Sequence, residues 1–178
     1  QISIKGEKEM NYRIETKEDF HVFGIEIMAS LSGEEGFLRP DQLWKKCQSN
    51  GEYDKLYEDA GGLPEFVPQD LCRIHAVENY RKTEGNTFSY MLFAFTTKNS
   101  KTDGYTKMHI PSQTYAVFSS DKFRWDEFND VLSGMQKRFY SEWLPTANYE
   151  RVDAANFEIY GGDEELGYLE LWFPVNKK

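Results

Sequence analysis

The sequence is poor in cysteine, histidine and long apolar runs, and each shortage removes a class of protein. Its 178 residues include only two cysteines, Cys47 and Cys72, and three histidines. They show no CxxC pair and no metal-site spacing, which favours two buried thiols in a reducing, cytoplasmic setting, although a single disulfide is compatible with the sequence. No apolar run approaches the roughly 18 residues that span a membrane, and no signal-peptide pattern opens the chain.

Positive charge is also scarce. The chain has 21 Lys and Arg against 30 Asp and Glu, which gives a formal net charge of −9. Such a field repels the phosphates of nucleic acid, and no basic helix or stripe overrides it. The chain alone is therefore a poor candidate for binding DNA, whereas an acidic field favours a cationic ligand or partner. Aromatic residues, in contrast, make up 16% of the chain, and the overall mixture is that of one globular domain.

Signatures of common enzyme classes are missing as well. The sequence has no GxSxG motif, no GxGxxG motif and no P-loop. The histidines, His21, His75 and His109, are scattered over strand-like segments, and Ser119-Ser120 stands where a helix cap explains it better than a nucleophile. The sequence thus predicts no catalytic residue, no metal ligand and no cofactor.

The apolar pattern of the first half predicts a strand, two helical pieces and a hairpin. Residues 20–28 alternate as a strand, Pro40 begins a helix that ends at Asn50-Gly51, and a second piece ends at Gly61-Gly62. Two strands then flank a turn at residues 82–86. Since the second of them is apolar almost throughout, we expect it to be buried on both faces and central in the sheet.

The second half predicts the same order again, after a break near residue 100. A strand region interrupted at Pro111 leads to a long helix, which Ser120 or Asp121 could cap and Pro145 would stop. The helix shows a 3.6-residue period. Its apolar positions are Trp125, Phe128, Leu132, Met135, Phe139 and Trp143. The whole chain therefore has a predicted β–α–β–β order repeated once.

The closing hairpin, residues 157–175, carries glutamates among aromatic residues. A turn centred on Glu164 would place Glu158 opposite Glu170. The even positions would then form an acidic, aromatic face, and the odd positions an apolar face that packs under the helices. The even positions are Glu158, Tyr160, Tyr168, Glu170 and Trp172. This face is either an exposed surface with solvated carboxylates or a pocket for a lipophilic cation, which carboxylates and aromatic rings attract together.

Three segments together resemble the GyrI-like small-molecule-binding domain, the effector domain of many AraC-type regulators. They are NYRIETKEDFHVFGIEI, IPSQTYAVFSS and NFEIYGGDEELGYLELWFPV, and their order covers essentially the whole chain. The resemblance implies an α+β fold in which two pseudo-symmetric β–α–β–β halves form one curved antiparallel sheet, with helices on one side and a ligand groove between the halves on the other. It assigns residues 11–178 to this domain and residues 1–10 to a linker or edge strand following a DNA-binding domain absent from this chain.

The resemblance also implies a ligand site. The family's pocket glutamate maps most closely onto Glu170, with Glu158 second; Trp172 shares the face of Glu170, and Tyr90 and Trp44 are first-half walls. The expected function is a cytoplasmic effector-binding domain of a bacterial transcription regulator, which binds a lipophilic small molecule, either aromatic or cationic, and reaches DNA only through another domain. Two alternatives stay open: a small hydrolase with a Glu/Tyr pair in the same groove, and a gyrase-inhibitor-like module that binds a protein.

Overall fold

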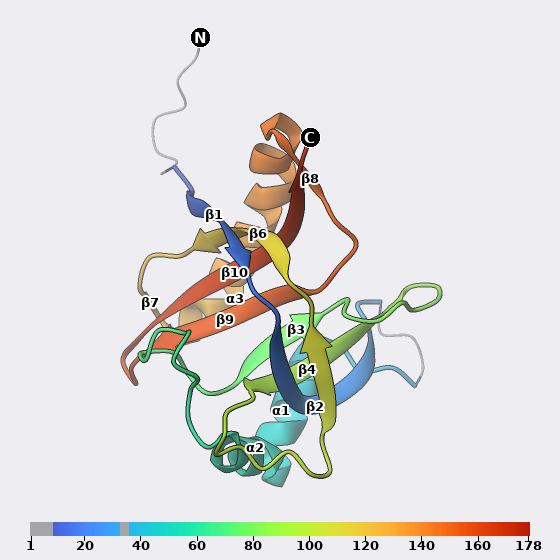
Figure 1. The fold of residues 1–178 in the computed structure, drawn as a ribbon, viewed down its shortest axis with the longest axis vertical. Helices are drawn as coiled ribbons and strands as arrows, with labels where there is room; N and C mark the ends of the chain where they lie inside the picture. Colours follow the sequence, from blue (N-terminus) through green and yellow to red (C-terminus); the bar gives the residue numbers. More distant parts are fainter. Residues whose placement is uncertain (1–8, 33–35) are drawn as a thin grey trace.

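One large antiparallel sheet carries three α-helices in the computed structural model, which describes residues 9–32 and 36–178 (Figure 1). The predicted linker or edge strand at residues 1–10 lies almost wholly outside these residues. The helices are α1 (Pro40–Asn50), α2 (Glu52–Ala60) and α3 (Phe128–Arg138). The strands are β1 (Asn11–Lys17), β2 (Phe20–Ser30), β3 (His75–Glu78), β4 (Thr87–Phe95), β5 (Thr106–Ile110), β6 (Gln113–Ser119), β7 (Phe123–Arg124), β8 (Tyr149–Arg151), β9 (Asn156–Gly162) and β10 (Leu166–Lys177).

The sheet mixes strands from both ends of the chain. Its order is β1-β6-β10-β9-β3-β4-β2-β5, and β7 and β8 each pair with β10. The apolar strand β4 lies between β3 and β2 and is buried along most of its length, as predicted. The strand predicted at residues 20–28 is β2. The strand β1, which precedes β2 in the chain, was not predicted. Pro111 separates β5 from β6, which agrees with the predicted interruption.

The ends of α1 and α2 follow their sequence signals, but the long helix differs from its prediction at both ends. It was expected to continue to Pro145, whereas α3 ends at Arg138 and a π-helical turn, Phe139–Trp143, follows it. Pro40 is the first residue of α1, and Gly51 and Gly61 end α1 and α2 in left-handed conformations with φ of 86° and 72°. The prediction that Ser120 or Asp121 caps the long helix was wrong. Ser120 instead accepts a hydrogen bond from the amide of Leu169 (2.9 Å), and the helix begins after a 3₁₀ turn at Trp125–Glu127.

The closing hairpin has a different register from the predicted one. Glu158 lies opposite Leu171, and Glu170 lies opposite Ile159. The Asp163 carboxylate accepts hydrogen bonds from the amides of Glu165 and Leu166, at 2.8 and 2.9 Å, and this stabilises a shorter turn than the one assumed. Because side chains alternate along a strand, this shift places Glu158 and Glu170 on opposite faces of the sheet.

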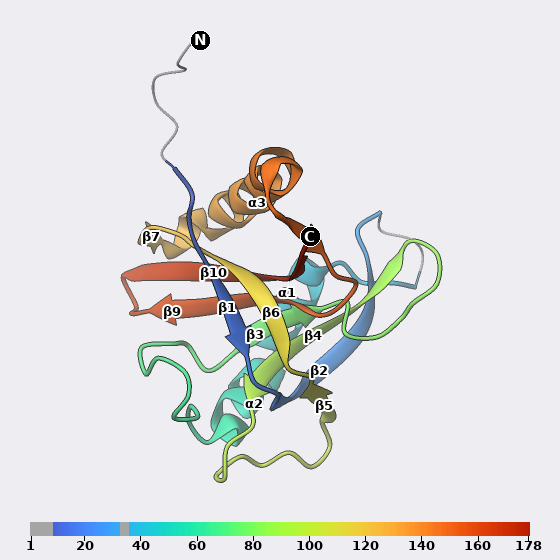
Figure 2. The same ribbon diagram turned by 45° about the horizontal axis from the view of Figure 1, so that its top comes forward.

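The two faces of the sheet bury separate clusters. On one face α1 and α2 pack over β2, β3 and β4, and α3 packs over β10 (Figure 2). On the other face the sheet curves around a cluster that includes Val22 of β2, Phe157 of β9 and Tyr115 of β6. In β10 the odd positions face the helices as predicted, but in β9 the even positions do. Within the described part of the chain, no helix has the length and apolarity of a membrane span.

Candidate functional site

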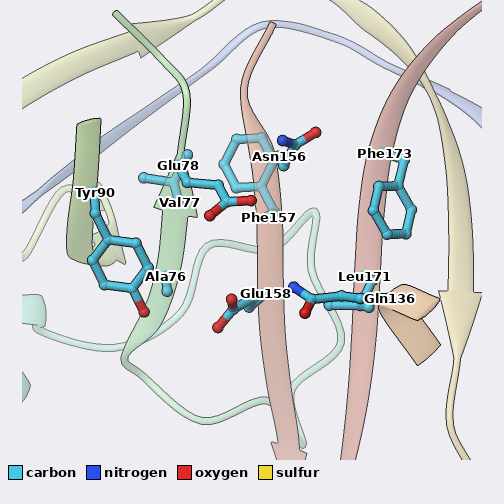
Figure 3. Close-up of a pocket in the computed structure, with 10 residues that line it drawn as sticks. All are labelled: Ala76, Val77, Glu78, Tyr90, Gln136, Asn156, Phe157, Glu158, Leu171 and Phe173. Carbon is cyan, nitrogen blue, oxygen red and sulfur yellow. The ribbon is translucent and has the colours of Figure 1, made fainter. Parts of the chain in front are cut away.

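The helix-covered face of the sheet holds a cleft of about 740 Å³. Side chains from β3, β4, β9 and β10 form its floor, and α1 and α3 supply its walls. The floor side chains Glu78, Tyr90 and Glu158 come from adjacent strands and point toward one another (Figure 3). The family resemblance implies a groove on the side of the sheet away from the helices. This cleft does not match that position, because it lies between α1 and α3.

Glu158 is one of two glutamates on the floor of the cleft, whose lining also includes Asp41, Asp153, Arg39, Lys45 and Arg151. Its Oε2 accepts a hydrogen bond of 2.9 Å from the Tyr160 hydroxyl, two residues along the same face of β9. Burial, followed by the nearby charge of Glu78, raises the pKa of the Glu158 carboxyl to about 7. The Tyr160 hydrogen bond opposes this rise. A carboxylate held in such a place is under-solvated, and a cation that enters the cleft would relieve it.

A second carboxylate, Glu78, belongs to the same floor. The pairing of β3 with β9 sets Ala76 opposite Glu158 and Glu78 opposite Asn156, so the two glutamates are diagonal neighbours. Burial raises the pKa of Glu78, while a hydrogen bond from Asn156 and the charge of Arg151 lower it. The buried Oδ1 of Asn156 has no hydrogen-bond partner among the described residues, so it can accept a hydrogen bond from a bound molecule.

Aromatic rings surround these carboxylates. The Trp44 indole N–H donates a 2.7 Å hydrogen bond to the Tyr90 hydroxyl, which ties α1 to the floor of the cleft. The Trp44 ring meets the Tyr160 ring edge-to-face, with centroids 5.9 Å apart. Burial raises the pKa values of Tyr90 and Tyr160 well above the ordinary range, so both phenols stay neutral at physiological pH. The site therefore joins acidic groups to neutral aromatic faces.

The structure divides the predicted site residues into two groups. Glu158, Tyr160, Tyr90 and Trp44 line the cleft. Glu170, Tyr168 and Trp172 lie on the opposite face of the sheet, because of the shifted register.

The residues of the second group already have partners outside the cleft. Glu170 forms an ion pair with Arg13 (2.9 Å) and accepts a hydrogen bond from Ser119 (3.2 Å). Trp172 is 4% exposed, and the Lys17 ammonium lies 4.0 Å from its ring centroid. The Tyr168 hydroxyl donates to Asp70 (2.9 Å).

Several residues of the cleft were not predicted from the sequence. Glu78 ends a four-residue strand, which is too short to show alternation, and its neighbour β9 is distant in the chain. Phe128, Leu132 and Gln136 were assigned to the packing stripe of α3 or passed over, yet they form the wall opposite α1. Their spacing of four residues was the available signal, since it places them on one face of a helix. Among the described residues, no group of three or more His, Cys, Asp or Glu could hold a metal ion.

The family comparison matches nearly the whole chain. The family described as Cass2, integron-associated effector binding protein, matches residues 13–175. That range contains every residue named above for the cleft. A comparison with curated protein sequences found no match.

Solved structures share the fold at low sequence identity. SAV2435 bound to tetraphenylphosphonium matches with a TM-score of 0.66 and 17% identity over 94% of each chain. An integron cassette protein from the mobile metagenome of Vibrio cholerae, Cass2, matches with a TM-score of 0.62 and 15% identity over 93% of this chain and 95% of that one. The C-terminal domain of EcmrR matches with a TM-score of 0.53 and 13% identity over 95% of this chain and 99% of that one. At such identities these matches establish the fold alone.

Proposed function

The chain belongs to the Cass2 family of integron-associated effector binding proteins, and we propose that its effector is a lipophilic cation held in the cleft beside Glu158. The observation that carries this proposal is the position of Glu158, a partly buried carboxylate among aromatic rings, with a pKa raised to about 7. A similar fold, that of SAV2435, is known with tetraphenylphosphonium bound. Lipophilic aromatic cations of this kind are therefore the first class to test.

The physical basis is the balance between desolvation and charge. A carboxylate loses solvation in an apolar site, and a hydrophilic cation would lose its own solvation on joining it. A cation whose charge is covered by aromatic groups is weakly hydrated. It therefore neutralises the carboxylate while losing less solvation of its own. The faces of Trp44 and Tyr160 add cation–π attraction, worth roughly 0.5–2 kcal/mol per contact.

The proposal includes a duplicated architecture with the cleft at its centre. The strand order supports it: exchanging β1 with β5, β2 with β6, β3 with β9 and β4 with β10 turns the order into its own reverse. The axis of this exchange lies between β9 and β3, the two strands that carry Glu158 and Glu78. The ligand would then bind where the two halves meet, on the side that α1 and α3 cover.

We further propose that the domain serves a bacterial transcription regulator and contacts DNA only through a separate domain on its N-terminal side. The net charge of −9 argues against DNA binding by these residues themselves. Ligand binding would bias the regulator through its different affinity for two states. The free thiols of Cys47 and Cys72 are consistent with a reducing, cytoplasmic setting.

The test compares two glutamates on opposite faces of one sheet. Tetraphenylphosphonium is titrated against the wild type, Glu158→Gln and Glu170→Gln, with calorimetry and with the fluorescence of Trp44 and the other tryptophans. We expect saturable binding that weakens about 10- to 100-fold in Glu158→Gln, because a charge-assisted contact is lost. Glu170→Gln should leave the affinity unchanged. Equal loss in both variants, or no binding by the wild type, would overturn the proposal and favour a protein partner.

A hydrolase remains the second candidate, and one observation favours it. A carboxyl with a pKa near 7, hydrogen-bonded to a tyrosine, is suited to act as a general base on a water molecule. The reaction would be hydrolysis of a small electrophile in the cleft. Turnover that Glu158→Gln abolishes, with product released on each cycle, would establish this function instead of stoichiometric binding.

A further inference from the structure

A second hollow of about 250 Å³ adjoins the cleft and differs from it in chemistry. The two share four lining residues, so they adjoin along these side chains. The shared residues are Trp44, Gln48, Phe128 and Tyr160. The second hollow extends toward Cys72, Tyr53 and Trp125, between α2 and the segment that precedes α3.

Among the residues that the structure describes, no charged side chain lines this second hollow. The pKa values of Tyr53 and of the Cys72 thiol are both raised by burial, so these groups are neutral at physiological pH. Its walls are mainly the rings of Trp44, Tyr53, Trp125, Phe128 and Tyr160. In the main cleft, by contrast, Glu78 and Glu158 lie on the floor.

The Tyr160 side chain separates the two environments. Its hydroxyl donates to Glu158 in the main cleft, while its ring meets the rings of Trp44 and Phe128 edge-to-face, with centroids 5.9 and 6.3 Å away. A ligand atom beside the Tyr160 hydroxyl is therefore next to the carboxylate, and a group on the other side of the ring meets the uncharged side chains that line the second hollow.

We propose that the second hollow is a subsite for an uncharged aromatic ring, joined by a short linker to the cationic centre that lies beside Glu158. The size fits, since an apolar cavity of about 150 Å³ accommodates benzene. Trp125, Tyr53 and Cys72 then determine which cations bind well: those with at least one aromatic arm. This inference rests on the proposed cation site only for the position of the rest of the ligand.

Cys72 provides a direct readout in the unmodified protein. It is partly exposed, whereas Cys47 is 0% exposed and serves as an internal control. The probes are tetraphenylphosphonium, tetraethylammonium and neutral naphthalene, and alkylation of Cys72 by a small maleimide is followed by peptide mass spectrometry. Tetraphenylphosphonium and naphthalene should slow the alkylation of Cys72 about tenfold at saturation, in proportion to the fraction of subsites filled. Tetraethylammonium should not slow it.

A variant at Cys72 tests the subsite by affinity. Cys72→Phe places a ring in the hollow. We expect Cys72→Phe to weaken tetraphenylphosphonium binding about tenfold through the lost burial of one ring, while the affinity for tetraethylammonium does not change. Thermal unfolding verifies that the variant folds, and the wild-type protection experiment stands if it does not.

The outcomes separate this inference from the cation site. If tetraphenylphosphonium binds to saturation but Cys72 stays fully reactive, the subsite proposal is wrong while the proposed function stands. Protection by naphthalene, with no cation bound at all, would support the subsite and overturn the proposed function. If neither tetraphenylphosphonium nor naphthalene protects Cys72, the subsite is wrong.

Discussion

The Tyr160 hydroxyl and the Glu158 carboxylate form a 2.9 Å hydrogen bond on the floor of the cleft. Both side chains come from the same face of β9, so the strand itself sets their spacing. This bond stabilises the ionised form of Glu158 against burial and the charge of Glu78.

The Tyr160→Phe variant tests that bond. Loss of the donor should raise the pKa of Glu158 above its value of about 7, so less carboxylate is ionised at neutral pH. We expect the affinity for tetraphenylphosphonium at pH 7 to fall roughly three- to tenfold, and the loss to shrink at pH 9. Calorimetry at both pH values measures this. A loss that is equal at the two pH values would show that Tyr160 acts through packing alone.

Cation affinity should depend on pH. Because a proton and the ligand compete for the Glu158 carboxylate, the affinity should rise about tenfold per unit as pH increases toward about 7, and level off above it. Titrations of wild type from pH 5 to pH 9 give the profile. The affinity of the Glu158→Gln variant should not depend on pH. If it still rises with pH in that variant, another group titrates, and Glu78 is the nearest candidate.

Stability should respond to the same residue with a defined sign. The pKa of Glu158 is higher in the folded chain, about 7, than its ordinary value of 4.5. The folded state therefore holds the proton more tightly, and the stability contributed by Glu158 falls as pH rises through this window. Glu158→Gln should increase the free energy of unfolding at pH 8 by roughly 1–3 kcal/mol and have little effect below pH 4.5. Urea unfolding at both pH values checks this, and a destabilised variant at pH 8 would contradict it.

The close pairing of β2 with β4 depends on a glycine. A Cβ added to Gly24 would collide with the backbone carbonyl of Leu92, which a buried, central strand cannot move away. Gly24→Ala should therefore lower the free energy of unfolding by roughly 3 kcal/mol or more.

Gly134 in α3 is the matched control for that substitution. It has open space around it, and Gly134→Ala should stabilise the protein by roughly 0.5–1 kcal/mol, because alanine favours a helix. Urea unfolding measures both variants. Similar values for the two would show that backbone crowding at Gly24 is not the cause.

The sequence alone determined the features that depend on neighbouring residues. The 3.6-residue period places α3, the uninterrupted apolar run places β4 inside the sheet, and Pro40, Gly51 and Gly61 mark the ends of helices. The alternation within β10 also holds. Each of these signals comes from local geometry, which a stretch of a few residues specifies by itself.

Only the tertiary structure decided which carboxylates meet. The turn held by Asp163 shifts the hairpin register by one residue, and that shift moves Glu158 away from Glu170. The pairing of β9 with β3 then brings Glu158 beside Glu78, which lies 80 residues earlier in the chain. Side chains alternate along a strand, so residues at even and odd positions of one strand lie on different faces. Which residues become neighbours depends on the register between strands that are far apart in the sequence. Those registers are set by the packing of the whole sheet, and no local pattern contains them.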